Sequence, residues 1–386
     1  MAMDGAGADV SKLREHNSLS IVRAMRGQPP ATVTELAGRT GLSRPGTDVV
    51  VRGLVTDGWV KVVEPDGSTV GRPARRYRFN ADAGHVLGVD VGAHKILVLL
   101  ADLEGEVVRS HRVPVEPEAD PAVRLAAVDT AITECLDAAG MRHDRIWAVT
   151  VGVTGPVDAT GRTTLFTPLP GWASVSPADH LSTRFSCPIL VENDCKLGAV
   201  AERWKGVAQD ADDIVYVLAG MRIGAGLILD GTLRRGYGGA AGEIGALKAV
   251  RWLSAPSHLD NCPGMPPEVH PDDRAAWVFD QVRAGDREAR AALRRYVKDL
   301  AIGAAALVLA LDPQVVVLGG GWSRSADLIV DPLAHELDRL CLRVPEIRAS
   351  TLGADSVALG ALRVALDQVD SVLFTDGMPA PLTSGA

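Results

Sequence analysis

Four apolar segments that each end in a glycine-containing turn constrain the fold of this chain more than any other feature. They occupy residues 87–92, 148–152, 214–220 and 315–321. Stretches with helical character intervene, near residues 120–139, 176–185, 196–205, 272–310, 324–343 and 355–368. Buried strands that alternate with helices predict an α/β body over residues 84–370 with a duplicated strand–loop pattern. In such folds the ligand binds where the strand ends meet the loops.

The net charge of −8 is distributed unevenly along the 386 residues. Residues 11–80, the head, contain 12 Lys and Arg against 6 Asp and Glu, a net charge of +6. Residues 81–386 contain 28 against 40, a net charge of −12. A basic head on an acidic body indicates a nucleic-acid partner for the head alone. A solvated helical surface would give the same balance, so charge alone leaves both interpretations open.

The head begins with two predicted helices. Residues 11–26 keep a rough helical spacing of apolar side chains and end at Gln28-Pro29-Pro30. Thr34 is expected to cap a short second helix over residues 35–39. Gly41 then provides a tight turn. This order of helix, short turn and helix is typical of a helix-turn-helix domain.

The third predicted helix follows directly. Ser43 is expected to cap it, with Pro45 in its first turn. Spacing of i, i+3, i+4 and i+7 predicts that its buried stripe consists of Thr47, Val50, Val51 and Leu54. Its exposed face then carries Arg44, Gly46, Asp48, Val49 and Arg52.

A basic hairpin completes the head. Residues 58–63 are expected to form a strand, residues 65–68 a turn, and residues 71–79 the returning strand. We therefore predict a winged helix-turn-helix over residues 11–80, whose third helix enters the major groove. The DNA-binding residues expected on this helix and on the wing are Ser43, Arg44, Gly46, Asp48, Val49, Arg52, Arg72 and Arg75. A small protein-interaction domain is the alternative.

The order of short motifs in the body resembles that of the ROK family, which groups repressors, reading frames without an assigned role and sugar kinases. The motifs are LGVDVGAHK (87–95), GVTGPVD (152–158), TPLPGW (167–172), VENDCKLGAVAERWKG (191–206), IGAGLILDGTLRRGYGGAAGEIG (223–245) and DPQVVVLGGGWS (312–323). The head is similar to the repressor branch through LREHN (13–17), ELAGRTGLSRP (35–45) and GRPARRYRFN (71–80).

This resemblance implies a two-lobed, actin-like fold of the sugar-kinase and RNase H-like type, with a sugar bound between the lobes. Lobe one is expected over residues 84–193 with the C-terminal helix added, and lobe two over residues 194–354. Residues 371–386 are expected to form a disordered tail.

The sugar side of the site is retained. Asp194 matches the family's catalytic base, Asn193 its sugar-binding neighbour, and Glu243 an acceptor for sugar hydroxyls; Gly171 is the fourth expected ligand contact. Carboxylates and amides suit sugars because they form strong hydrogen bonds with hydroxyl groups. Taken alone, the pair Asn193-Asp194 would indicate a helix cap. Trp172 is a candidate stacking face for a sugar, with a core tryptophan as the alternative.

The phosphate side of the site is degenerate. The family's first phosphate loop has the pattern DxGxTK, and here a histidine replaces the threonine in the stretch that contains Asp90, Gly92, His94 and Lys95. The second loop, GTGIG in the family, carries Met221 and Arg222 before Gly224. Close backbone approach to phosphate depends on glycine, so we expect no kinase activity and no ATP cofactor. Arg222 pointing to solvent would still permit weak nucleotide binding.

No metal is expected either. The chain has five scattered cysteines, and Ala246 stands where the family's zinc pattern has histidine. A closed zinc site needs four ligands of the Cys or His type. His258, Cys262 and His270 form only a loose set, within a stretch (250–271) whose prolines predict an irregular loop.

These observations predict a DNA-binding regulator of carbohydrate metabolism genes, a homodimer or homotetramer that binds a double-stranded DNA operator and a sugar or sugar derivative. Two alternatives stay open: an active sugar kinase with a DNA-binding head, and a regulator that responds to a protein partner without a sugar. No apolar run reaches the ~20 residues that a membrane span needs. The N-terminus lacks the features of a signal peptide, so the expected location is the cytoplasm without membrane attachment.

Overall fold

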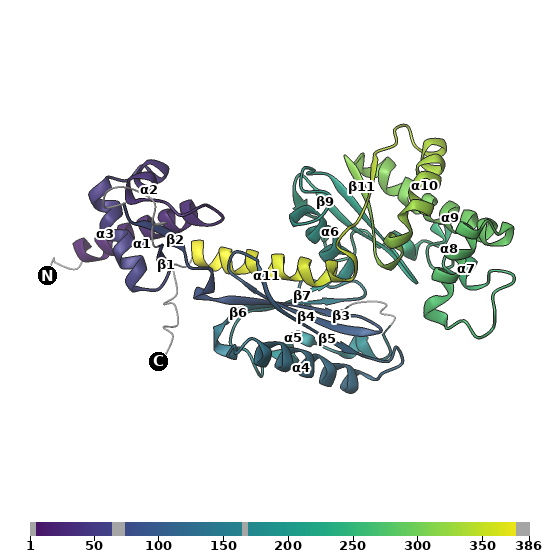
Figure 1. The fold of residues 1–386 in the computed structure, drawn as a ribbon, viewed down its shortest axis with the longest axis horizontal. Coiled ribbons are helices and arrows are strands. Elements are labelled where there is room, and N and C mark those ends of the chain that lie inside the picture. Colours follow the sequence, from purple (N-terminus) through teal and green to yellow (C-terminus); the bar gives the residue numbers. More distant parts are fainter. Residues whose placement is uncertain (1–4, 64–73, 164–168, 376–386) are drawn as a thin grey trace.

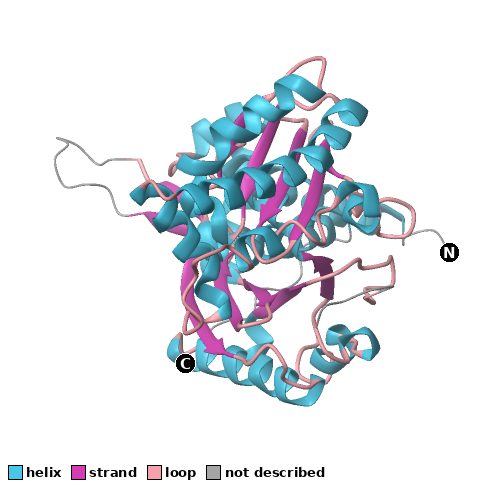
Figure 2. Cartoon of the chain, turned by 90° about the vertical axis from the view of Figure 1, so that its right-hand side faces the viewer, coloured by secondary structure: helices cyan, strands magenta, loops and turns pink. Residues whose placement is uncertain are grey.

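The computed structural model describes residues 5–63, 74–163 and 169–375. The head lies at one end of an elongated molecule, and two five-stranded sheets with their helices form the rest (Figure 1). Turned by 90°, the two sheets are seen as separate layers surrounded by helices (Figure 2). None of the described helices has the length and apolar character needed to cross a membrane.

Three helices and an antiparallel strand pair form the head. They are α1 (Gly5–Met25), α2 (Val33–Thr40), α3 (Arg44–Thr56), β1 (Val60–Val63) and β2 (Arg76–Phe79). The prediction of Thr34 as the cap of α2 is wrong, because the helix begins at Val33, two residues earlier than expected, and Thr32 caps it. Thr32 accepts the Glu35 backbone N–H at 3.2 Å, and Glu35 accepts the Thr32 N–H at 2.6 Å. This reciprocal capping box satisfies two backbone donors at once.

The third helix agrees with its prediction. The Ser43 hydroxyl accepts the Gly46 N–H at 3.3 Å, and proline occupies the first turn. The buried residues are the predicted Thr47, Val50, Val51 and Leu54. Among the described residues the returning strand begins at Arg76, so residues 74–75, which were predicted to belong to it, lie outside the strand. The predicted turn at 65–68 and Arg72 lie outside the described residues.

Lobe one is built on the sheet of order β5-β4-β3-β6-β7. Its strands are β3 (His85–Val91), β4 (Lys95–Asp102), β5 (Val107–Pro114), β6 (Ile146–Val153) and β7 (Ile189–Asn193). Two helices, α4 (Pro121–Ala138) and α5 (Pro177–Leu181), cover one face, and α11 (Ser356–Thr375) crosses the other (Figure 1). The alternating side chains of β3 and β6 therefore reach apolar cores on both faces.

Lobe two repeats this arrangement with the order β10-β9-β8-β11-β12. Its strands are β8 (Ile214–Ala219), β9 (Ile223–Leu229), β10 (Thr232–Leu233), β11 (Val315–Gly319) and β12 (Glu346–Ala349), and its helices are α6 (Asp194–Trp204), α7 (Ser257–Asp260), α8 (Arg274–Ala284), α9 (Arg287–Leu311) and α10 (Ala326–Leu340). In each sheet three strands pair antiparallel and the last two add in parallel. The predicted duplication is thereby confirmed.

Short 3₁₀ helices lie in the connections between these elements. They are η1 (Ala81–Ala83), η2 (His143–Arg145), η3 (Trp172–Ser174), η4 (Ile244–Ala246), η5 (Lys248–Val250), η6 (Pro271–Asp273), η7 (Gly321–Ser325) and η8 (Gly353–Asp355). The stretch 250–271, predicted to be irregular, contains the one-turn helix α7. The C-terminal tail does not begin at residue 371 as expected: α11 continues to Thr375, because Leu373 is buried in a core that includes the head.

The head shares one hydrophobic cluster with lobe one and α11. Trp59 of the head meets Trp147 edge-on at a centroid distance of 5.4 Å. Arg26, in the turn after α1, pairs with Asp370 of α11 and donates a hydrogen bond of 2.6 Å to the Leu103 carbonyl. The head is therefore fixed to the end of α11 by both apolar and ionic contacts.

Candidate ligand cleft and nucleic-acid interface

Asn193 and Asp194 lie where β7 ends and α6 begins. The Asn193 side-chain oxygen accepts the Lys196 N–H at 3.1 Å, so this residue does cap α6, while its amide nitrogen donates to the Gly155 carbonyl at 3.1 Å. One oxygen of Asp194 accepts the Cys195 N–H at 2.8 Å and the Asn193 amide at 3.0 Å. These contacts orient the Asp194 carboxylate, to which the Thr154 side chain also hydrogen bonds.

Asp194 lies close enough to two other acidic side chains, Asp90 and Glu243, for its charge to affect both. Loss of water on burial raises the pKa of Asp194 and of Glu243, and it raises the pKa of Asp90 to about 6. The negative charge of Asp194 further raises the pKa of both other groups, while Lys95 lowers that of Asp90 and Lys196 lowers that of Glu243. The structure thus places Asp194 near two other predicted residues, and pKa shifts of this kind are frequent at functional sites.

The contacts of Gly171 and Trp172 differ from those of the three acidic side chains. Gly171 is exposed with φ +64°, and a Cβ there would lie 2.9 Å from Cγ of Pro121. Trp172 is completely buried in the core of lobe one. The hypothesis of a sugar-stacking face at Trp172 is therefore wrong, because its ring has no exposed surface. A ligand contact at Gly171 stays a prediction.

The turn between β3 and β4 corresponds to the first phosphate loop. Lys95 lies 3.6 Å from the Asp90 carboxylate and donates to the Ala354 carbonyl at 2.6 Å. Arg124, on α4 and fully buried, donates to the carbonyls of Gly92 and Ala93 at 2.6 and 3.1 Å. Motif reasoning missed Arg124, although helical periodicity places it on the buried stripe of α4.

His94 in this turn reaches across to the other lobe. Its Nδ1 lies 3.3 Å from a carboxylate oxygen of Asp272 in η6. An imidazole therefore occupies the position of the family's hydroxyl and faces a carboxylate of lobe two. A second ion pair, from Arg112 of β5 to Asp355 of η8, directly before α11, measures 3.2 Å.

The turn between β8 and β9 corresponds to the second phosphate loop. Met221 and Arg222 are both exposed. Burial lowers the pKa of Arg222, and the nearby charge of Asp194 raises it. The guanidinium therefore lies near the cleft carboxylate even though solvent reaches it. Gly224 has a packing reason, since a Cβ there would lie 2.5 Å from the Cys195 sulfur on α6.

The segment that carries zinc ligands in the family pattern is attached to α9 instead. His258 lies 2.8 Å from the buried carboxylate of Asp299, and the Trp252 indole donates to the Leu300 carbonyl at 3.1 Å. Within the described part of the chain, no three His, Cys, Asp or Glu side chains are arranged to hold a metal ion. Sequence reasoning missed both Trp252 and Asp299.

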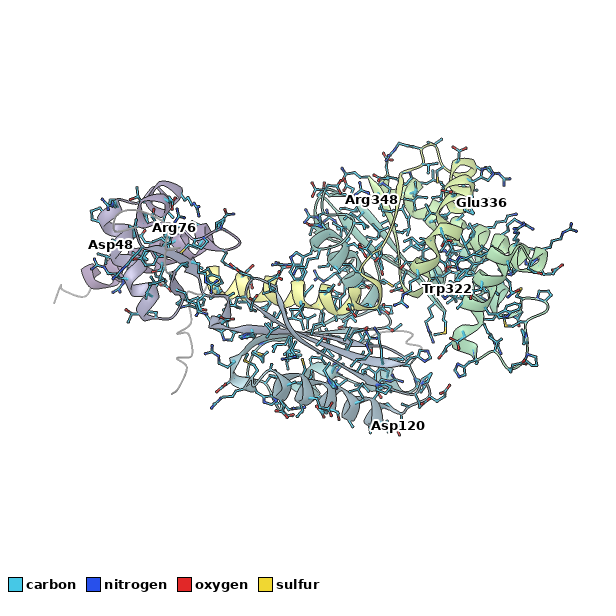
Figure 3. All side chains as sticks on the ribbon, viewed as in Figure 1. Asp48, Arg76, Asp120, Trp322, Glu336 and Arg348 are labelled. Carbon is cyan, nitrogen blue, oxygen red and sulfur yellow. The ribbon has the colours of Figure 1, made fainter. Side chains whose placement is uncertain are left out.

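The exposed face of α3 carries its predicted residues. Ser43, Arg44, Gly46, Val49 and Arg52 are exposed, and Asp48 is half-buried. Asp48 and Arg52 pair at 2.6 Å, so each is the other's first partner in the free protein. Arg75 is exposed before β2, whereas Arg76 is held by the Pro30 carbonyl at 2.6 Å. Figure 3 shows Asp48 and Arg76 in the head, far from Trp322 of lobe two.

Comparison with known proteins gives some matches to the body alone and others to nearly the whole chain. The model of the ROK family matches residues 86–263 and 272–368. The xylose repressor of Caldicellulosiruptor bescii is 22% identical, over 92% of this chain and 97% of the repressor.

Two solved structures extend this comparison. The fold is similar to that of a ROK family transcriptional regulator, a homologue of the E. coli MLC protein, with a TM-score of 0.70, 19% identity, and coverage of 94% of this chain and 98% of the regulator. A ROK family glucokinase from Streptomyces griseus, solved with glucose and AMPPNP, gives a TM-score of 0.61 and 25% identity. It covers 74% of this chain and 100% of the kinase, so a complete kinase accounts for only part of the chain.

Proposed function

Since this chain belongs to the ROK family, we propose that it is a DNA-binding transcriptional repressor of carbohydrate metabolism genes whose kinase-like body binds a sugar or sugar derivative without phosphorylating it. The observation that carries the proposal is the head, three helices and a strand pair with a basic sequence, attached to a sugar-kinase-like body. The repressor and regulator relatives extend over more than nine-tenths of the chain, whereas the glucokinase covers about three-quarters of it.

The head acts as a winged helix-turn-helix in a homodimer or homotetramer. In that geometry α3 enters the major groove and the β1–β2 hairpin contacts the flanking backbone. Arg44 at the start of α3 is the main base or phosphate contact, and Val49 meets a thymine methyl group. DNA competes for the Asp48–Arg52 pair, so that Arg52 can turn to a phosphate. Arg72 and Arg75 contact phosphates from the wing.

The body binds its effector with the polar groups of Asn193, Asp194 and Glu243. Carboxylate oxygens accept hydrogen bonds from vicinal hydroxyls, which is the chemistry that a sugar offers. The exposed Arg222 adds a positive charge at the edge of this group. A phosphorylated or acidic sugar is therefore a second form of effector, because a guanidinium pairs with phosphate or carboxylate.

The signal passes from the cleft to the head through two helices. Asp194 begins α6, and α6 crosses α11 so closely that a Cβ at Gly360 would clash with the Leu197 carbonyl. The far end of α11 carries Asp370, the partner of Arg26 at the head. A sugar that prefers one arrangement of the lobes would move this helix pair and change the spacing of two heads on DNA.

Sequencing of bound genomic fragments tests the DNA-binding part. Full-length protein is incubated with sheared genomic DNA of its source, with and without xylose, glucose, N-acetylglucosamine and their phosphates. We expect enrichment upstream of carbohydrate genes and a change in enrichment with at least one sugar. Arg44→Ala should abolish enrichment, and Arg75→Ala should reduce the salt slope of binding by about 1. The exposed Arg290→Ala on α9 is the matched control, and equal enrichment by Arg44→Ala would contradict the proposal.

An active kinase is the second candidate, because Asp194 is retained and glucokinases are among the relatives. The proposal predicts no phosphorylation of hexoses or N-acetylhexosamines with ATP and magnesium. His94 replaces the phosphate-loop hydroxyl, and Met221-Arg222 replaces a flexible loop. Turnover of roughly one per second, typical of working enzymes, that disappears in Asp194→Asn would establish the kinase instead.

A further inference from the structure

A cavity lies along the outer edge of β7. Its volume is about 490 Å³, within the range of small-molecule sites. Lobe one contributes residues 157–161 and 189–192, lobe two contributes residues 235–237 with Gly239, and Val364 of α11 closes one side. Since side chains alternate along a strand, Glu192 of this cavity and Asn193 of the cleft point to opposite faces of the lobe-one sheet.

An ion pair between the lobes lines this cavity. Glu192, whose side chain is 5% exposed, accepts a hydrogen bond of 2.5 Å from Nε of Arg235, and its other oxygen accepts the Asn193 N–H at 3.0 Å. Within the part of the chain that the structure describes, Arg235 has no second acceptor, so its terminal amino groups can serve a ligand. A carboxylate beside a guanidinium offers acceptors and donors for adjacent hydroxyl groups.

The aromatic ring of Tyr237 lies exposed at the rim of the cavity. Tyr237 is fully exposed, on a loop that passes through Gly236 and Gly239 with φ +77° and +76°. The loop is fixed from below: a Cβ at Gly239 would clash with the Val157 carbonyl, and the buried Lys196 ammonium donates to the Gly239 carbonyl. A ring on an anchored loop beside a polar cavity is suited to stacking against an apolar face of a ligand.

We propose that this cavity is a second small-molecule site, which takes a neutral saccharide. Its C–H face would stack on Tyr237, and its hydroxyls would form hydrogen bonds with Glu192 and Arg235. These contacts would use both the aromatic ring and the ion pair that line the cavity. Glu192 offsets the charge of Arg235, and Asp158 adds a negative charge, so an anionic ligand is disfavoured. Because both lobes form the walls, an occupant would stabilise one arrangement of the lobes. The choice of saccharide rests on the proposed sugar response, whereas DNA binding is not required.

Calorimetry and amide hydrogen exchange on the full chain test this site. Glucose, xylose and sucrose are titrated as neutral probes, and glucuronate as the anionic one. Four proteins are compared: wild type, Glu243→Gln, Tyr237→Ala, and Tyr237→Phe, which retains the ring. Since Tyr237 is fully exposed, its substitutions should leave the melting temperature unchanged.

We expect a neutral saccharide to retain one binding event in Glu243→Gln, with slower exchange at residues 157–161 and 235–239. That event should weaken about tenfold or more in Tyr237→Ala and persist in Tyr237→Phe. Loss of all saccharide binding in Glu243→Gln, or equal binding by Tyr237→Ala, would overturn the second site. Binding of glucuronate alone would overturn the neutral class. Failure of the cleft proposed above gives a different result: binding unchanged in Glu243→Gln and lost in Tyr237→Ala.

Discussion

Two ionisable side chains at the β3–β4 turn, Arg124 and Asp90, are buried. Arg124 is fully buried and donates to four carbonyl oxygens, those of Gly92, Ala93, Glu116 and Pro117. Asp90 is 7% exposed at the end of β3. A buried charge is tolerated only when strong hydrogen bonds or a counter-ion replace its water. The β3–β4 turn, which was predicted to be a degenerate phosphate loop, is therefore held in place by contacts within the protein.

Removal of the Arg124 guanidinium should destabilise lobe one. Arg124→Ala strips four carbonyls of their donor, and an unsatisfied buried group costs about 1–3 kcal/mol. We expect a loss of about 3 kcal/mol in the free energy of unfolding in urea, with a smaller loss for Arg124→Lys, which keeps the charge. A loss below about 1 kcal/mol in Arg124→Ala would show that the turn does not depend on these bonds.

Replacement of Asp90 should stabilise the protein in a pH-dependent way. Burial raises the pKa of Asp90 to about 6, so the folded state binds its proton more tightly than the unfolded chain. The stability therefore falls as pH rises between about 4 and 6, and the cost persists above that window. In Asp90→Asn this cost is absent. We expect its advantage in urea unfolding over wild type to grow by about 2 kcal/mol between pH 4.5 and 7.5; a constant difference would contradict this.

At the scale of elements, the sequence predicted those features that depend only on residues close together in the chain. The cap and buried stripe of α3 follow from residues 43–54 alone, and they are confirmed. The cap of α2 was misplaced because Thr32 and Thr34 are both cap residues, and only the reciprocal bond with Glu35 selects the first. Trp172 and Trp252 depend on distant partners, so no local pattern distinguishes a core tryptophan from an exposed one.

The segment from η4 to α7 depends on α9 for its position. Trp252 is buried, bonds to the Leu300 carbonyl, and packs so tightly that a Cβ at Gly303 would clash with its ring. Trp252→Ala should lower the free energy of unfolding by about 3–5 kcal/mol, and Trp252→Phe should lower it by about 1 kcal/mol for the lost hydrogen bond.

A chelator should leave the melting temperature unchanged, because protein contacts anchor the segment from η4 to α7. A drop on chelation, reversed by zinc, would refute this account.

At the scale of the whole molecule, motif order predicted the two-lobed body but not the attachment of the head. Asn193, Asp194 and Glu243 were predicted as ligand contacts because motifs record short stretches around each side chain. The cluster that joins Trp59, Trp147 and α11 was not, since it arises only when three distant segments pack. The interlobe contacts of His94 and Arg235 were missed for the same reason.

The attachment of the head predicts how a sugar response can be uncoupled from sugar binding. Asp370→Asn weakens the ion pair with Arg26 at the head while leaving the cleft untouched. Sugar affinity should stay within about twofold, whereas the ratio of operator affinities with and without sugar should move toward one, because that ratio measures the coupling between the sites. Asp331→Asn, at an exposed position of α10 with no side-chain partner among the described residues, is the control and should keep the wild-type ratio. The measurements are calorimetry for the sugar and fluorescence anisotropy for an operator fragment. An unchanged ratio in Asp370→Asn would mean that this pair does not carry the coupling, and that the apolar part of the shared cluster, centred on Leu366 and Val369, transmits the movement of α11 instead.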